Sequence, residues 1–114
     1  LDDLEWLIYQ LREHNSNVCI LINSIIPRPV DFAETNPKIA NINQGIKALT
    51  KRFPGVGYNP CYRIFLKKNP FWYDEALYDT RDKFRLHLSH SGLRRMKKDL
   101  LNQIAFWRKG EICK

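Results

Sequence analysis

A chain of 114 residues is long enough for one small domain with a buried core and too short for two. Its 44% hydrophobic and 27% charged residues argue against a disordered chain, and no apolar run approaches the ~20 residues of a membrane span. The formal charge of +7 lies in the tail, because residues 1–80 hold nine Lys/Arg and nine Asp/Glu, whereas residues 81–114 hold ten and three.

The first half of the chain predicts a helix, a strand and a second helix. Residues 1–13 form an amphipathic helix, and the apolar run VCILINSII, residues 18–26, is typical of a fully buried strand in a parallel sheet. After a loop rich in proline, Pro37 is expected in the first turn of the next helix. The apolar positions of the two helices are Leu4, Leu7, Ile8 and Leu11, then Ile39, Ile42, Ile46 and Leu49.

The second half predicts a short strand around residues 56–58, a brief helix followed by an aromatic loop over residues 62–79, and a last helix that begins near Ser91 as its N-cap. The aromatic residues of the loop are more typical of packing than of base stacking. They are Phe65, Phe71, Trp72, Tyr73 and Tyr78, and the apolar stripe of the last helix is Leu93, Met96, Leu100, Ile104 and Trp107. The layout is α/β, with two strands too few for a self-sufficient sheet.

The residues that most often bind metals or cofactors give little signal. Three widely spaced cysteines do not predict a disulfide framework and favour a reducing compartment. His14 and His90 lack metal-ligand spacing, and no Gly-rich phosphate loop is present, so neither a metal nor a cofactor is expected. Ser24, Ser89 and Ser91 lie outside any nucleophile elbow of the G-x-S-x-G type, so none is expected to be a nucleophile.

The order of motifs suggests a family. An apolar strand, a PRP loop, the helix INQGIKAL, a short strand and LHLSHSGLRRM follow one another. This order resembles the C-terminal half of SGNH (GDSL-type) hydrolases. In that family an Asp-x-x-His-Leu-Ser/Asn-x-x-Gly block supplies the catalytic acid and base, and His87, Leu88, Ser89 and Gly92 match its end.

The resemblance implies both a fold and an activity. The fold is a partial three-layer sandwich, similar to half of a flavodoxin-like domain, in which a short parallel sheet is flanked by helices. Residues 1–114 would be one partial domain, whose N-terminal half with the nucleophile is absent. The activity is hydrolysis of acyl esters by a Ser-His-Asp triad, with His87 as the base.

Two departures weaken the catalytic interpretation. Phe84 stands where the family has Asp, and Phe cannot orient an imidazole. Asp82, five residues before His87, could replace that acid only if the loop carries an insertion. No Gly-Asp-Ser occurs in the sequence, so nucleophile and oxyanion donors would have to come from an upstream half. Alone, the chain is expected to be inactive.

The rival interpretation is a non-catalytic module that binds nucleic acid, another polyanion or a protein. Catalytically dead SGNH proteins that bind RNA are known, and the last helix places basic residues opposite its apolar stripe. The residues that would bind are Arg94, Arg95, Lys98, Phe106 and Lys109, with Arg81, Lys83 and Arg85 extending the surface. A solvated basic face accounts for the same pattern. Unpaired strand edges also predict pairing with a second copy or with the missing N-terminal half.

Overall fold

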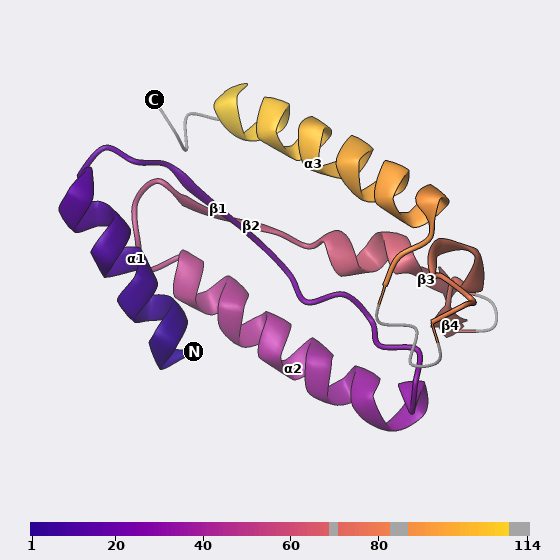
Figure 1. The fold of residues 1–114 in the computed structure, drawn as a ribbon. Coiled ribbons are helices and arrows are strands. Elements are labelled where there is room, and N and C mark those ends of the chain that lie inside the picture. Colours follow the sequence, from indigo (N-terminus) through magenta and orange to yellow (C-terminus); the bar gives the residue numbers. More distant parts are fainter. Residues whose placement is uncertain (69–70, 83–86, 110–114) are drawn as a thin grey trace.

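The computed structural model describes residues 1–68, 71–82 and 87–109. In chain order its elements are α1 (Asp2–His14), β1 (Ile20–Asn23), α2 (Phe32–Thr50), β2 (Val56–Asn59), the 3₁₀-helix η1 (Cys61–Phe65), β3 (Leu66–Lys68), β4 (Phe71–Tyr73), the 3₁₀-helix η2 (Glu75–Leu77) and α3 (His90–Lys109). β1 and β2 pair in parallel, and β3 and β4 form a separate antiparallel pair. Helices α1 and α2 lie on one side of the parallel pair and α3 on the other (Figure 1). The predicted α/β class, a short parallel sheet between helices, is confirmed.

One face of the parallel pair is packed against the first two helices. Residue Ile20 lies opposite Val56 in the register, and alternate side chains of a strand point to the same face. Val56 therefore packs with Ile8 of α1 and Leu49 of α2, and Ile20 and other half-buried residues surround this cluster. Because these residues are ordinary members of the predicted apolar patterns, local sequence and tertiary packing agree here.

The opposite face of the sheet receives α3 at a glycine. A side-chain Cβ on Gly57 would lie only 2.8 Å from Nε1 of Trp107 and 3.0 Å from its Cε2. The missing side chain thus leaves room for the buried indole. Further along β2, Asn59 donates from Nδ2 to Oδ2 of Asp99 at 3.2 Å. Helix α3 is therefore attached to β2 by one apolar and one polar contact.

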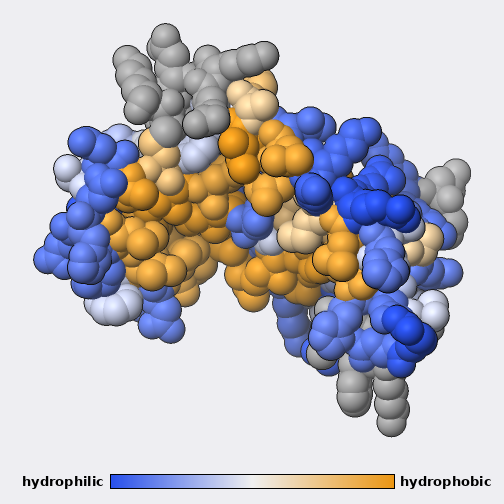
Figure 2. Space-filling view, turned by 45° about the horizontal axis from the view of Figure 1, so that its top comes forward, coloured by the Kyte–Doolittle hydropathy of each residue, from blue (hydrophilic) through white to orange (hydrophobic). Residues whose placement is uncertain are grey.

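The prediction of a fully buried strand over residues 18–26 is wrong. The strand β1 has only four residues, of which three are half-buried and Asn23 is exposed, whereas three of the four residues of β2 are buried. Within the described residues β1 has a neighbour on one edge only, which leaves its flank open. Figure 2 shows an apolar band across the middle of one face, with hydrophilic surface on both sides. The exposed aliphatic residues include Leu7, Leu11, Ile25, Leu93 and Leu101.

Helix α2 begins earlier than Pro37 predicts. The chain enters it through Asp31, whose φ of 54° is in the left-handed region that Asp tolerates, and whose carbonyl accepts from the backbone of Thr35 at 2.8 Å. Phe32 in the first turn is buried in an aromatic cluster. Pro37 therefore lies inside the helix instead of in its first turn, a position that is costly because proline lacks the N–H donor. Burial of Phe32 explains why the helix nevertheless starts there.

A second core lies at the other end of α2 from the first. Its buried residues are Phe32, Phe65, Tyr73, Leu77 and Tyr78. The predicted brief helix is present as η1, but part of the predicted aromatic loop is the β3–β4 hairpin, whose exposed Phe71 and Trp72 still contact the ring of Phe32. The buried Tyr78 donates from its hydroxyl to the carbonyl of Pro27 at 2.5 Å, which ties this core to the chain after β1.

The N-cap residue of α3 differs from the predicted one. Ser89, not Ser91, is the N-cap, because its Oγ accepts from the backbone N–H of Gly92 at 3.1 Å. Leu93 also falls off the buried stripe and is 55% exposed. The contacting side of the helix instead includes Gly92, Met96 and Trp107. The glycine, without a side chain, lets the first turn approach η2 closely.

A pair of helical glycines tests this close approach. A Cβ at Gly92 would lie 2.1 Å from the carbonyl oxygen of Leu77, whereas a Cβ at Gly45 would meet only the end of the flexible Leu1 side chain. We expect Gly92→Ala to lower the free energy of unfolding by ~1–3 kcal/mol. Gly45→Ala should leave it unchanged or raise it by up to ~1 kcal/mol, through helix propensity. Urea titration of both variants checks this, and equal stabilities would contradict it.

Candidate functional site

The segment between η2 and α3 is a loop closed by backbone hydrogen bonds. Asp79 donates its N–H to the carbonyl of His87 at 3.0 Å, and Ser89 donates to the carbonyl of Leu77 at the same distance. Residues 83–86 lie outside the described part of the chain, and so does Phe84 at the position of the family's acid. The two closing bonds hold the residues on either side of the loop next to each other.

Asp82 and His87 are brought into contact by this closure. The imidazole Nδ1 lies 2.8 Å from Oδ2 of Asp82, and the backbone N–H of His87 donates to the same oxygen at 3.0 Å. The Asp82 side chain is 18% exposed, whereas the His87 side chain is 82% exposed. The carboxylate is therefore mostly buried beside a ring that faces solvent, and the nitrogen directed away from the carboxylate is Nε2.

The contact with Asp82 favours one nitrogen of the His87 ring as the proton acceptor. A carboxylate bonded to Nδ1 favours the tautomer with its proton on that atom and stabilises an imidazolium, so that Nε2 becomes a proton acceptor. The neighbouring cation does not compete, because Arg81 is bonded to Asp79 through Nε at 3.2 Å. The side-chain and backbone donors of Arg81 lower the pKa of Asp79. Among the described residues of the loop, Arg81 thus pairs with Asp79 and His87 with Asp82.

Two of the serines singled out from the sequence are occupied by structural bonds. The buried Ser24 accepts from the backbone N–H of Tyr62 at 2.9 Å. Ser89 caps α3 and donates to the carbonyl of Ala76 at 2.7 Å. A hollow of about 500 Å³ beside the loop is lined partly by Tyr78, Asp79, Arg81 and His90, yet neither Asp82 nor His87 lines it. In the described residues, the acid–base pair has no nucleophile bonded to it.

The remaining candidate ligands are dispersed. Across residues 1–68, 71–82 and 87–109, no three His, Cys, Asp or Glu side chains lie close enough to hold a metal ion. His14 ends α1, and His90 begins α3. None of the helices in the same ranges has the length and apolar character needed to cross a membrane.

The predicted basic surface lies along α3. The side chains of Arg94, Arg95 and Lys98 are exposed, and they border a shallow hollow of about 440 Å³ beside Ile64 of η1. Phe106 is 71% exposed. Lys109 ends the helix, and its side chain lies outside the described part, as do Lys83 and Arg85 of the loop. The structure thus places three of the predicted cations on one helix surface.

A serine–cysteine contact occupies the carboxyl ends of the two parallel strands, and sequence reasoning did not single it out. Ser24 Oγ lies 3.4 Å from Sγ of Cys61, and Cys61 is 1% exposed. Burial raises the pKa of this thiol, which outweighs the opposing hydrogen bond from Ser24. The thiol is therefore protonated and unsuited to nucleophilic attack. Cys61 is free.

Comparison with known proteins gives one informative likeness. No protein-family model matches the chain, and no curated protein matches it. Among solved structures the chain is similar to a "putative platelet activating factor from Streptococcus pneumonia", with a TM-score of 0.75 and 21% sequence identity over 90% of this chain. The chain spans 49% of the length of that protein. At this identity the likeness shows the fold, which is that of about half of the larger protein.

The buried thiol gives a chemical test of the strand ends. We expect Cys61 to resist a disulfide-exchange reagent in the folded chain and to react once the chain is unfolded. Because folding raises the pKa of this thiol, its contribution to stability is complete below the ordinary thiol pKa and falls as the pH rises above it. The free energy of unfolding of Cys61→Ala should therefore fall less at alkaline pH than that of the unchanged chain. Rapid labelling of the native thiol, absent in Cys61→Ala, would contradict the assignment.

Proposed function

We propose that the chain is the half of an SGNH-type ester hydrolase that carries the base and its acid. The observation that supports this is the 2.8 Å contact between His87 Nδ1 and Asp82 Oδ2, in the loop that precedes the last helix. The sequence HLSHSG, which ends the family's block, places His87 at the base position. In this proposal Asp82 takes the role that the family gives to an acid two residues later, at the position of Phe84.

The chemistry of this half is limited to proton transfer. A serine hydroxyl supplied from elsewhere would give its proton to Nε2 of His87 as it attacks an acyl carbon. The carboxylate of Asp82 would stabilise the imidazolium while the tetrahedral intermediate exists, and the imidazolium would then protonate the leaving alcohol. The two hydrogen bonds to Asp82 hold both the backbone and the ring of His87, which fixes the direction of the accepting nitrogen.

The missing half would complete the sheet at β1. Within the described residues β1 has a free edge and is only partly buried, as expected where further parallel strands and helices pack. The likeness to about half of a larger solved protein supports the same interpretation. The nucleophile and oxyanion donors would then belong to the segment that pairs with β1.

Ester hydrolysis distinguishes the 114-residue chain from a protein that also contains the upstream half. The 114-residue chain should not turn over short-chain p-nitrophenyl esters above the rate of its His87→Ala variant. With the upstream half present, Asp82→Asn should lower kcat by roughly 10³–10⁴-fold, the order seen when a triad acid is removed. Asp79→Asn is the matched control, because Asp79 lies in the same loop and pairs with Arg81 instead. An active whole protein that tolerates Asp82→Asn would contradict the proposed role.

A second candidate function is polyanion binding by α3. It is favoured by the exposure of Arg94, Arg95 and Lys98, none of which pairs with a carboxylate of the described residues, and by the exposed ring of Phe106. Such a surface would bind through release of counterions from phosphates, with little sequence preference.

The basic helix is tested by charge reversal. Replacement of Arg94, Arg95 and Lys98 with Glu should abolish binding of a labelled oligonucleotide, and the logarithm of the affinity of the unchanged chain should fall linearly with that of salt concentration. Phe106→Ala should weaken single-strand binding more than duplex binding, by ~1–3 kcal/mol per stacked base. The control replaces three other exposed lysines, Lys38, Lys67 and Lys68, with Glu. Equal affinities of the two triple variants in fluorescence anisotropy would contradict binding by α3 and would show that its basic residues are an ordinary solvated surface.

A further inference from the structure

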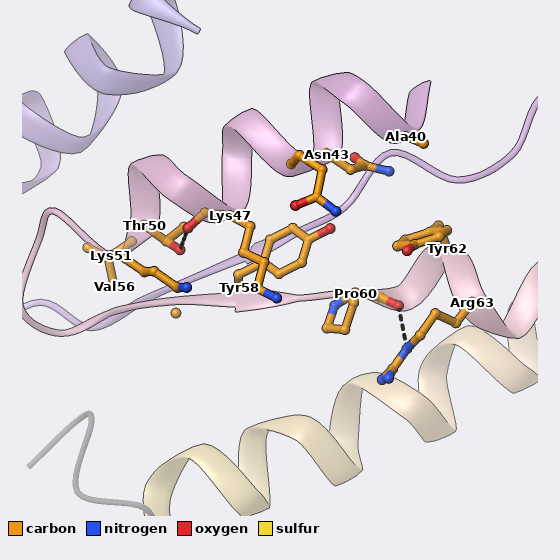
Figure 3. Close-up of a pocket in the computed structure, with 12 residues that line it drawn as sticks. Ala40, Asn43, Lys47, Thr50, Lys51, Val56, Tyr58, Pro60, Tyr62 and Arg63 are labelled. Atoms are coloured by element: carbon orange, nitrogen blue, oxygen red, sulfur yellow. Dashed lines mark hydrogen bonds between the residues drawn. The ribbon is translucent and has the colours of Figure 1, made fainter. Parts of the chain in front are cut away.

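A cleft separate from the histidine loop lies between α2 and the outer edge of β2. Its volume is about 470 Å³, and its walls are the C-terminal half of α2, β2 and the start of η1. Figure 3 shows the side chains of Lys47 and Lys51 extending from α2 toward β2, with Tyr58 between them and Tyr62. The volume is within the range of small-molecule sites, roughly 300–1,000 Å³.

The charge of this cleft is one-sided. Lys47, Lys51 and Arg63 line it, and no Asp or Glu does. Within the described residues, no carboxylate forms an ion pair with any of the three. Lys47 lies in the last turn of α2 and Lys51 is its C-cap residue, four residues later, a spacing at which like charges repel. A concave wall that holds unpaired cations concentrates positive potential and attracts an anion.

The cleft also offers a neutral donor. In the parallel register the backbone of Gly57 faces β1, so the N–H of the next residue, Tyr58, points to the outer edge, where the cleft lies. Burial raises the pKa of the Tyr58 phenol, whose hydroxyl already has the side chain of Ser24 as a hydrogen-bond partner. Arg63 donates from Nε to the carbonyl of Pro60 at 3.3 Å, which fixes one side of the guanidinium and leaves its other N–H groups for a ligand.

Other polar residues of the cleft are already engaged. Asn43 accepts from the backbone N–H of Ile25 at 2.8 Å and donates to its carbonyl at 2.9 Å. The hydroxyl of Thr50 donates to the carbonyl of Lys47 at 2.8 Å. These residues shape the wall and hold α2 in place, so that recognition falls to the two lysines, Arg63, Tyr62 and the backbone N–H of Tyr58.

We propose that this cleft binds a small organic phosphate. Two or three cations match the charge of a phosphate dianion better than that of a single carboxylate, and Arg63 can offer paired N–H groups to its oxygens. The ring of Tyr62 lies at one end of the cleft, where it can contact a planar group attached to the phosphate (Figure 3). A mononucleotide has both features and fits a cavity of this size. The site does not depend on the histidine loop.

The experiment measures binding of AMP, inorganic phosphate and adenosine to the 114-residue chain by titration calorimetry. AMP should bind and adenosine should not. The double variant Lys47→Gln/Lys51→Gln should lose about 100-fold in affinity for AMP, at about tenfold for each charge-assisted contact. The matched control is Lys67→Gln/Lys68→Gln, which removes the same charge from β3, outside the cleft, and should bind AMP within about twofold of the unchanged chain.

The outcomes separate the sources of binding. Inorganic phosphate that binds as tightly as AMP, and that depends on the same two lysines, supports a phosphate site that does not use the attached ring. AMP that binds more tightly than phosphate, with a loss in Tyr62→Ala, supports the nucleotide form. Unchanged AMP affinity in the cleft variant, or an equal loss in the β3 control, overturns the proposal. Circular dichroism checks that the lysine variants, all changed at exposed positions, and the variant at the half-buried Tyr62 are folded.

Discussion

The parallel pairing of β1 with β2 is the interaction on which the rest of the structure depends. Each strand is four residues long, so the pair has little stability of its own and must be covered on both faces. Apolar side chains at alternate positions hold α1 and α2 on one face. On the other face a glycine without a side chain admits the indole of Trp107. The positions of all three long helices therefore follow from two short strands.

The two proposed sites are built by different means. The histidine loop is closed by backbone hydrogen bonds and rests on an aromatic core, in which Tyr78 is bonded to the carbonyl of Pro27. The phosphate cleft is a gap between a helix and a strand edge, and its walls are set by the bonds of Asn43 to Ile25. Because different bonds position the two sites, one can lose its function while the other keeps its geometry.

The sequence predicted best those elements whose local pattern and tertiary packing agree. Helix α1 and the short strand β2 were recovered, and Ile8 and Val56 of their predicted apolar positions are buried in one cluster, whereas Leu7 and Leu11 of the predicted α1 stripe are exposed. Pro37 led to a wrong prediction of where α2 begins, because burial of Phe32 outweighs the hydrogen bond that is lost at the proline. Ser91 was predicted as the N-cap of α3, but Ser89 is an equally good capping residue, so the sequence does not distinguish the two. The close approach of Gly92 to η2 selects Ser89.

The sites were harder to predict than the helices. His87 was singled out through a short motif, but no spacing rule tells that a loop brings Asp82 into contact with its Nδ1. The cleft gave no sequence signal at all. Lysines four residues apart on a helix are typical of a solvated face, and Arg63 lies in a different element. Only the packing of α2 beside the edge of β2 turns these charges toward a common space.

The two cores of the molecule share no buried residue, yet two helices connect them. Phe32 and Leu49 stand near the two ends of α2, one in each core, and lie ~25 Å apart at 1.5 Å per residue. Helix α3 also connects the two cores, over ~16 Å at 1.5 Å per residue, between Met96, against the aromatic core, and Trp107, against the sheet. If either core unfolded alone, one end of α2 and of α3 would lose its packing contacts while the other end stayed packed. The molecule, 42 Å in its longest dimension, should therefore unfold as one cooperative unit instead of in two stages.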